Sequence, residues 1–299
     1  MEKLRINNIP IADFDVILGE NSYKSLLQWP SLKSVQTNNW AEDDGIEVDL
    51  SAPRLSSRNF SLYFHGYGED RYAEFISYLS NSAINDFWFP ELGIKLSLRV
   101  DSNSLSKMQG NWQSFSINFV DDSPRMVFEP LLIDGTPTDY QIDGTDFADY
   151  GLIVLEGTDK SLKQLPKNKQ RLTISLDSQD GAVYDSDGSV NTESTKATLK
   201  LLLRAKTIHE CIRLYYTFLR DMTTPQSKEL FRADKIESYE CYYDSNSVSN
   251  FCLLHSGLWG IVFDLTINII RYSIGDDEYI VDDSGLIMLL TDDGKYLKK

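Results

Sequence analysis

Alternating apolar and polar residues predict several strands along this chain. Over Trp112 to Val120, and again over Trp259 to Ile270, the alternation is nearly regular, as expected of strands with one buried face. In chain order the expected strands are Asp13 to Leu18, Phe60 to Phe64, Trp112 to Val120, Asp149 to Leu155, Ala197 to Leu203 and Trp259 to Ile270. The chain is therefore expected to be rich in β structure.

Two segments have the periodicity of an amphipathic helix, and each follows a predicted strand. Apolar residues spaced to form one helical face are Tyr72, Phe75, Ile76 and Leu79 in the first segment, and Ile208, Cys211, Ile212, Tyr215 and Leu219 in the second. Thr207 and Glu210 have the spacing of a capping box at the start of the second helix.

The first half of the chain recurs in the second half. Shifting the sequence by 136 positions aligns residues 13–49 with 149–185 without a gap, and 13 of these 37 pairs are identical. About two identities would be expected by chance. The identical pairs are Asp13/Asp149, Ile17/Ile153, Glu20/Glu156, Lys24/Lys160, Ser25/Ser161, Leu26/Leu162, Gln28/Gln164, Pro30/Pro166, Lys33/Lys169, Thr37/Thr173, Asp44/Asp180, Gly45/Gly181 and Asp49/Asp185. We therefore interpret the chain as an internal duplication.

Further matches extend the repeat with slowly growing offsets, as insertions in loops would produce. The sequence from Asp101 to Ser106 recurs from Asp244 to Ser249 at an offset of 143, and Trp112 meets Trp259 at 147. Both copies also have an Asp-Gly turn signal, which favours a hairpin or loop with glycine at positive φ. The predicted fold class is α+β and mainly β, with two tandem β-sandwich or barrel domains, each flanked by one helix.

The repeat also predicts the domain boundaries. Copy one should span 1–125 and copy two 126–271, with the joint at Asp121 to Pro124. The remaining residues, 272–299, contain several Asp-rich turn signals between short apolar runs. We interpret them as a C-terminal β-hairpin extension.

Composition limits the classes of function. The 45 acidic and 29 basic residues give a formal charge of -16, which argues against specific nucleic-acid binding because phosphate contacts need an excess of Lys and Arg. The opening residues, Met1 to Glu20, have no apolar stretch of signal-peptide length, and no segment has the roughly 20 apolar residues of a membrane span. We expect a soluble protein of cytoplasmic origin, without membrane insertion.

Residues with catalytic or ligand-binding chemistry are few. The three cysteines, Cys211, Cys241 and Cys252, have no metal-binding spacing and are interpreted as buried free thiols. The three histidines, His65, His209 and His255, are interpreted as surface or packing residues, and no hydrolase or zinc-protease motif is present.

Two short glycine-containing motifs are also weak signals. Gly66-Tyr67-Gly68 lacks the third glycine and the lysine of a phosphate loop. Asp185-Ser186-Asp187-Gly188 lacks the remaining ligands of a calcium loop and is interpreted as a solvated loop. We therefore expect no catalytic, cofactor-binding or metal-binding residues, no cofactor and no enzymatic activity.

The repeat unit resembles the N-terminal domain of the distal tail proteins of long-tailed phages. The resemblance lies in Asp13, Phe14 and Ile17, Pro30, the Asp44-Gly45 turn, the strand from Phe60 to Phe64 and the helix around Phe75. That domain belongs to the tail-tube-like class, which also forms tube subunits and baseplate hubs. The resemblance implies a tail-tube-like fold in both copies.

The duplication departs from the distal tail pattern, in which an unrelated β-barrel usually follows the ring-forming domain. Two tail-tube-like domains in one chain resemble the hub proteins, of which three chains form a pseudo-sixfold ring. The resemblance implies a structural component of a phage or prophage tail, made in the bacterial cytoplasm and assembled in the virion tail. It also implies a trimeric or hexameric ring with tube and tip subunits as partners.

A different class of function stays open at this stage. A duplicated β-sandwich could be a carbohydrate- or protein-binding module that uses exposed aromatic residues such as Trp29, Trp40 or Trp88. For Phe87, Trp88 and Phe89, we favour core or interface packing over a sugar-stacking surface.

Overall fold

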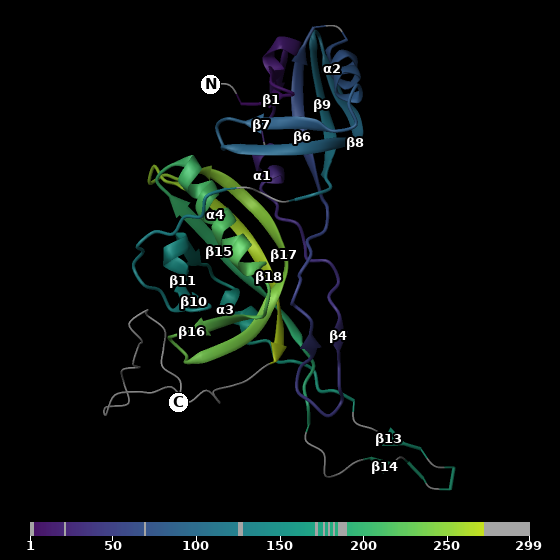
Figure 1. Cartoon of the computed structure of the whole chain (residues 1–299), viewed down its shortest axis with the longest axis vertical. Coiled ribbons are helices and arrows are strands. Elements are labelled where there is room, and N and C mark those ends of the chain that lie inside the picture. Colours follow the sequence, from purple (N-terminus) through teal and green to yellow (C-terminus); the bar gives the residue numbers. More distant parts are fainter. Residues whose placement is uncertain are drawn as a thin grey trace.

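Two seven-stranded antiparallel sheets with the same strand order form the protein (Figure 1). The computed structural model describes residues 3–20, 22–68, 70–124, 128–170 and 190–271, together with 173–175, 177–178, 180–181 and 183–184. The first sheet has the order β2-β1-β7-β8-β9-β6-β3, and the second has the order β11-β10-β16-β17-β18-β15-β12. The mainly β fold with two sandwich domains is as predicted. The predicted hairpin over 272–299 and the Asp185 to Gly188 motif lie outside the described residues.

The first copy contains nine strands, two α-helices and one 3₁₀ helix among the described residues. In chain order they are β1 (Arg5–Ile6), β2 (Ile9–Pro10), η1 (Ile11–Phe14), β3 (Val16–Leu18), α1 (Ser22–Leu26), β4 (Thr37–Asn38), β5 (Glu47–Val48), β6 (Arg58–Tyr67), α2 (Arg71–Ser80), β7 (Asn85–Phe89), β8 (Ile94–Gln109) and β9 (Trp112–Asp121).

The second copy repeats these elements in the same order. They are β10 (Tyr140–Ile142), β11 (Thr145–Asp146), η2 (Phe147–Tyr150), β12 (Leu152–Val154), α3 (Thr158–Leu162), β13 (Thr173–Ile174), β14 (Val183–Tyr184), β15 (Thr195–Ala205), α4 (Ile208–Met222), β16 (Lys228–Arg232), β17 (Glu237–Leu253) and β18 (Trp259–Arg271). The predicted duplication is therefore present in the order of elements and in the topology of both sheets.

Strand register shows the duplication residue by residue. Bulges in β8 at Val100/Ser102 and Leu105/Lys107 recur in β17 at Tyr243/Ser245 and Val248/Asn250, all 143 positions later. This offset agrees with the repeat predicted from Asp101 to Ser106. Bulges locally bend and twist a strand, so their recurrence means that both long strands bend at the same places.

The expected equivalence of Trp112 and Trp259 is wrong by one residue. Trp112 pairs with Gln109, and the equivalent pair in copy two is Gly260 with Cys252. A longer turn follows β17 and places Trp259 one pair beyond this position. Identical residue types aligned the two tryptophans, whereas backbone hydrogen bonding sets the actual register.

The two strands expected before α1 and α3 each begin as a 3₁₀ helix. In copy one, η1 ends at Asp15, whose φ of 53° is left-handed, and β3 starts at Val16. In copy two, Gly151 with a φ of 70° takes the same place before β12. A left-handed residue reverses the local path of the chain, so only the second half of each expected segment joins the sheet.

Each long central strand links two layers of its copy. The first part of β8 pairs with β7 and its later part pairs with β9. Strands that bend from one layer into another form the corners of sandwiches. The helix α2 packs inside this bend, where Phe75 contacts Phe64 and Phe115 with ring centroids 5.2 and 6.0 Å apart. The aromatic cluster is the centre of the core of copy one.

One position shows that the copies diverged while keeping the same geometry. In copy one, Tyr23 of α1 contacts the ring of Phe89 in β7 at 6.4 Å. The equivalent residues in copy two, Asp159 and Arg232, form an ion pair at 2.9 Å. Arg232 is almost fully buried and also pairs with Asp234 and Glu237. A compensated buried guanidinium thus replaces an aromatic contact.

The helices of the two copies differ in length. Tyr72 in α2 and Tyr215 in α4 are equivalent, because their rings lie 5.3 and 5.1 Å from the equivalent Phe115 and Phe263. α4 therefore begins about two turns earlier, and the predicted capping box of Thr207 with Glu210 is present there.

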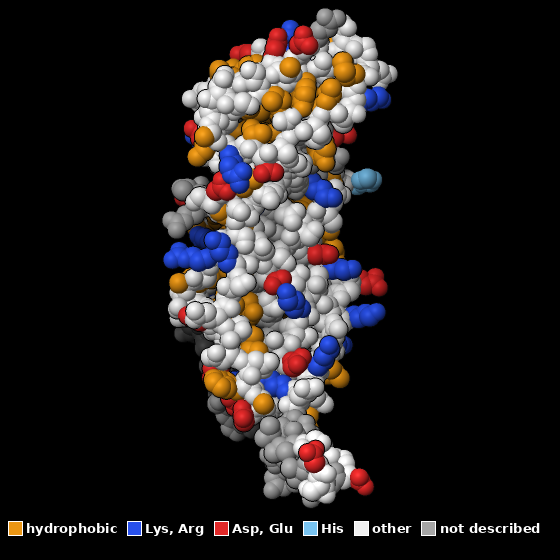
Figure 2. All heavy atoms as spheres, turned by 90° about the vertical axis from the view of Figure 1, so that its right-hand side faces the viewer, with side chains coloured by type: hydrophobic (Ala, Val, Ile, Leu, Met, Phe, Trp, Pro, Cys, Tyr) orange, Lys and Arg blue, Asp and Glu red, His pale blue; other side chains and the backbone are white. Residues whose placement is uncertain are grey.

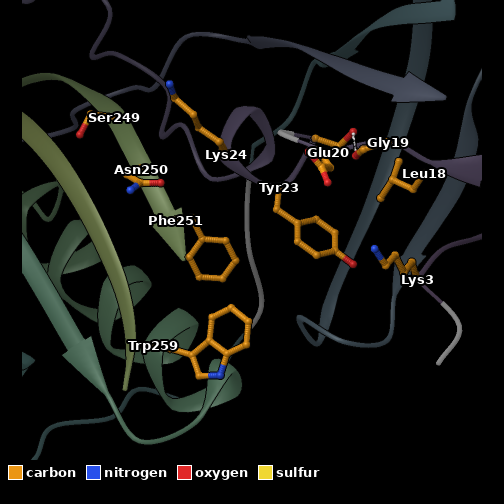
Figure 3. A pocket seen from close by; sticks show the side chains of 11 residues that line it. Lys3, Leu18, Gly19, Glu20, Tyr23, Lys24, Ser249, Asn250, Phe251 and Trp259 are labelled. Carbon is orange, nitrogen blue, oxygen red and sulfur yellow. Dashed lines mark hydrogen bonds between the residues drawn. The ribbon is translucent and has the colours of Figure 1, made fainter. Parts of the chain in front are cut away.

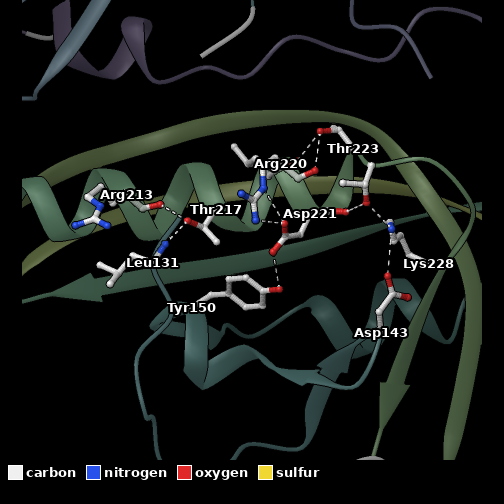
Figure 4. Close-up of polar contacts among 11 residues, drawn as sticks. Leu131, Asp143, Tyr150, Arg213, Thr217, Arg220, Asp221, Thr223 and Lys228 are labelled. Carbon is white, nitrogen blue, oxygen red and sulfur yellow. Dashed lines mark hydrogen bonds and ion pairs between the residues drawn. The ribbon is translucent and has the colours of Figure 1, made fainter. Parts of the chain in front are cut away.

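Helix α4 binds the segment that joins the copies (Figure 4). Leu131 donates its backbone N–H to Thr217 Oγ1 at 2.9 Å, and Arg213 donates to the Glu129 carbonyl at 3.0 Å. At the other end of α4, the Tyr150 hydroxyl donates to Asp221 at 3.1 Å. The joining segment is thereby attached to copy two along one side of α4.

Candidate assembly interface

The three histidines, which were interpreted as surface or packing residues, lie on separate elements of the structure. His65 lies in β6 with its Nδ1 2.9 Å from Ser114 Oγ, His209 lies in the first turn of α4, and His255 lies in the turn after β17. Among the described residues, no group of three or more His, Cys, Asp or Glu side chains could hold a metal ion.

The Gly66-Tyr67-Gly68 motif at the end of β6 does not form a phosphate loop. The Gly68 N–H donates to the Asn111 carbonyl at 2.8 Å, and the Tyr67 N–H donates to the Asp15 carbonyl at 3.0 Å. A phosphate site needs backbone N–H groups that point at the ligand. Both of these N–H groups are already used within the protein.

The cysteines divide into two classes. Cys211 and Cys241 are buried, and burial raises the pKa of each thiol to about 12. Because the thiolate is the nucleophile, neither is suited to catalysis at neutral pH. Cys252 is half-buried, so the expectation of buried thiols holds for two of the three.

A specific contact joins the two copies. The segment between α1 and β6, residues 27–57, runs from copy one along the side of copy two (Figure 1). We name it the copy-one arm. Its equivalent in copy two, the segment between α3 and β15, is named the copy-two arm and spans residues 163–194.

The base of the copy-one arm is fixed by three hydrogen bonds to copy two. Tyr215 donates its hydroxyl to the Leu27 carbonyl at 2.9 Å, and Tyr243 donates to the Pro30 carbonyl at 2.9 Å. Asn246 Oδ1 accepts the Trp29 N–H at 2.9 Å. These bonds are buried, so breaking any one leaves a polar group without water as a substitute.

Aromatic packing accompanies these hydrogen bonds. Trp29 is only 5% exposed, and its ring lies 5.5 Å from that of Tyr216 in α4. Nearby, Tyr23 faces Phe251 at 6.4 Å across a cavity of about 330 Å³ that both copies line (Figure 3). Burial of a large aromatic residue contributes strongly to an interface.

The tip of the copy-one arm is held by a buried lysine. Lys169 donates its ammonium to the carbonyls of Trp40, Asp43 and Gly45, each at 2.6 Å. Three carbonyl oxygens match the three N–H groups of an ammonium. Asn191 adds a bond from its Nδ2 to the Ala41 carbonyl at 2.9 Å.

Gly45 allows the closest approach in this contact. Its φ is 71°, its N–H donates to the Thr192 carbonyl at 2.8 Å, and a Cβ at this position would lie 2.0 Å from the Ile270 carbonyl oxygen. A residue with a side chain would clash here. The predicted Asp44-Gly45 turn is therefore present, and its glycine contacts copy two directly.

Signals of this interface in the sequence are only indirect. Lys33/Lys169 and Gly45/Gly181 were recognised as identical pairs, yet their sequence neighbourhoods did not show that Lys169 and Gly45 meet. Trp29 was considered an exposed aromatic residue and is buried. Among the buried partners, Asn246 lies in the repeated segment Asp244 to Ser249, but the repeat does not indicate its contact with Trp29. No sequence signal points to Tyr243.

The other aromatic candidates have separate surroundings. Trp40 is exposed and donates its Nε1–H to Glu47 at 3.0 Å, which lowers the pKa of that carboxyl. Trp88 is half-buried with the Lys95 ammonium 5.1 Å above its ring, whereas Phe87 and Phe89 are in the core, as expected.

Most of the exposed large hydrophobic side chains among the described residues lie on copy one. Figure 2 shows them gathered over the upper unit, which is copy one. On the outer face of its sheet, Tyr67 and Trp112 are exposed neighbours with ring centroids 5.1 Å apart, next to Tyr63. Strand register places Lys200 and Arg204 of copy two at the positions of Tyr63 and Tyr67. The outer faces of the two copies therefore differ in chemistry.

No protein-family model matches this chain, and no curated protein matches it at a significant level of sequence similarity. No helix in the described part of the chain is long and apolar enough to cross a membrane.

Proposed function

We propose that this protein is a structural component of a phage or prophage tail, a distal tail or baseplate hub ring that joins the tail tube to the tip and acts by self-assembly without catalysis. The observation that carries the proposal is the contact between the copies, in which the arm of one unit covers the sheet of the next. The two surfaces of this contact are different, so the contact is heterologous. Repetition of a heterologous contact forms rings when the rotation closes.

Exposed apolar surface on copy one supports contacts with other tail proteins. Contiguous exposed apolar patches commonly mark protein interaction sites. Because Lys200 and Arg204 replace the tyrosines in copy two, the outer faces of alternate positions in a ring would differ. Such alternation suits an adaptor with a tube subunit on one side and a tip subunit on the other.

The net charge of -16 agrees with a conduit for DNA that does not bind it specifically. Phosphate would be repelled from an acidic wall. If the acidic wall keeps DNA from sticking, neutralising acidic residues on the lumen side should slow DNA ejection. Unchanged ejection would count against this role of the charge.

The alternative function is a duplicated β-sandwich module that binds carbohydrate or protein. Its aromatic candidates are now Trp40 and Trp88, since Trp29 is buried between the copies. A glycan array separates the two functions, because a tail ring should self-associate without saccharide affinity, and substitution of Trp40 should leave that association unchanged.

The test of the proposed function is absolute mass by light scattering over a wide concentration range, followed by negative-stain electron microscopy. We expect a trimer or hexamer that forms with increasing concentration and appears as a ring with a central hole. A monomer at every concentration, with and without candidate tube and tip proteins from the same gene neighbourhood, would contradict the proposal.

A further inference from the structure

Each surface of the contact between the copies has an equivalent that the chain leaves uncovered. Trp29 is 5% exposed, and its equivalent 136 positions later, Leu165, is 69% exposed. Val248 is 4% exposed, and its equivalent in β8, Leu105, is 40% exposed. The covering segment of copy two and the sheet end of copy one are therefore both exposed apolar surfaces in a single chain.

The covering segments leave the two copies in the same way. Leu26 and Leu162 are both fully buried at the ends of α1 and α3. Ser25 Oγ accepts the Ser61 N–H at 3.0 Å, and the equivalent Ser161 Oγ accepts the Thr198 N–H at 2.7 Å. The segment Lys163 to Pro166 is thus anchored like Leu27 to Pro30, but its Leu165 is exposed where Trp29 is buried.

The receiving surface of copy one already has the polar arrangement found in copy two. Tyr72 and Asn103 are hydrogen bonded to each other, as are the equivalent Tyr215 and Asn246. In copy two, Asn246 directs its Nδ2 to the tyrosine and its Oδ1 to the covering Trp29 N–H. In copy one, the Tyr72 hydroxyl donates to Asn103 Oδ1 instead.

We infer that a second copy of this chain docks here, with Lys163 to Pro166 of one molecule covering Tyr72, Asn103 and Leu105 of the next. The Asn103 amide turns over on docking, so that Oδ1 accepts the Leu165 N–H and the Tyr72 hydroxyl donates to the Lys163 carbonyl. Leu165 packs toward the α2 side of this surface. The inference rests on the proposed self-assembly and names the contact that performs it.

Lys33 indicates a second point of the same contact. It is the equivalent of Lys169 and is exposed, and its ammonium has no hydrogen bond or ion pair with any residue in the part of the chain that the structure covers. In a repeated contact, Lys33 would donate to the Gly181 carbonyl of the neighbouring molecule, as Lys169 donates to the equivalent Gly45 carbonyl within the chain.

Disulfide cross-linking tests the inference even where association is weak. Leu165→Cys and Asn103→Cys are prepared as separate full-length chains in a Cys252→Ser background and mixed under mild oxidation. We expect dimers on a non-reducing gel at least tenfold above those of a Leu165→Cys and Ile84→Cys mixture, since Ile84 is exposed in the turn before β7. Equal yields for the two mixtures would overturn the inference.

Mixing charge variants tests whether the contact is head-to-tail. Leu165→Asp removes the covering side and Leu105→Asp removes the receiving side, so each variant alone should remain monomeric. Their mixture has one intact contact and should stop at a dimer, while Ile84→Asp should assemble like the native chain. Rings formed by Leu165→Asp would overturn the inference. The proposed self-assembly would then be correct but would use a different surface. Specific cross-links without any ring would support this docking contact and contradict the proposed ring.

Discussion

The Tyr215 hydroxyl of copy two donates a 2.9 Å hydrogen bond to the Leu27 carbonyl of copy one, in a fully buried setting. Burial raises the pKa of Tyr215 well above its ordinary value of 10.0, so the phenol is a neutral donor at neutral pH. This bond connects the core of one sheet unit directly to the backbone of the other.

Removing this hydroxyl should destabilise the contact between the copies. For Tyr215→Phe we expect the free energy of unfolding to fall by about 1 to 3 kcal/mol, because the Leu27 carbonyl is left buried without its donor. Urea unfolding followed by fluorescence measures the change. Tyr63→Phe is the control, because Tyr63 is exposed, and its free energy should change by less than about 0.5 kcal/mol. Equal effects of the two substitutions would contradict the role of the Tyr215 bond.

The duplicated lysines form a matched pair for substitution. Lys169→Met should lower the free energy of unfolding by about 2 kcal/mol or more, because three carbonyls of the copy-one arm lose their charged donor. Lys33→Met should change it by less than about 0.5 kcal/mol in the isolated chain, since Lys33 is exposed. Chemical denaturation at low protein concentration makes the comparison, and equal losses would show that Lys169 does not hold the arm.

The duplicated glycines form a second matched pair. Gly45→Ala should cost about 2 to 4 kcal/mol, because it combines a left-handed backbone with a clash against the Ile270 carbonyl. Gly181→Ala keeps the backbone strain at a φ of 86°, but no described atom lies within 4 Å of its Cβ position. We therefore expect Gly181→Ala to lower the free energy of unfolding by about 1 to 2 kcal/mol. In thermal unfolding, Gly45→Ala should have a clearly lower melting temperature than Gly181→Ala. The reverse order would contradict the close approach of Gly45 to the Ile270 carbonyl.

Thiol alkylation should distinguish the three cysteines. Native protein treated with iodoacetamide at pH 8 should be modified at Cys252 alone, because burial raises the pKa of Cys211 and Cys241 to about 12 and also blocks the reagent. In denaturant all three should react. Peptide mass spectrometry locates the adducts, and rapid native modification of Cys211 would mean that α4 opens readily from the sheet.

Asp244 should make part of the stability depend on pH. Its carboxyl pKa is lowered from 3.8, since hydrogen bonds from Lys196 and Asn268 outweigh the opposing effect of burial. A lowered pKa in the folded state means that the contribution is complete above pH 3.8 and is lost as the pH falls through the lower folded value. The stability difference between the native chain and Asp244→Asn, from urea unfolding at pH 6 and pH 3, should therefore shrink in acid. A constant difference would contradict the assignment.

Several features of the fold could be predicted from the sequence because their cause is local. Alternation along Trp112 to Val120 sets a strand with one buried face, and the spacing of Tyr72, Phe75 and Leu79 sets a helix. The duplication followed from identical residues at a fixed offset. The sequence also indicated the arm hairpin through Asp44-Gly45, since glycine alone readily takes the left-handed turn that this site requires.

The tertiary structure alone decided which member of each repeated pair is buried. Lys33 and Lys169 are lysines at equivalent positions of the two arms. Lys33 is exposed, whereas Lys169 donates hydrogen bonds to three carbonyls. Burial depends on what lies against a surface. Among the described residues the copy-one arm lies against copy two, whereas Leu165 of the copy-two arm is exposed. The pattern of residues therefore determined the unit and its repetition, and the packing of one unit against the next determined where the assembly surfaces lie.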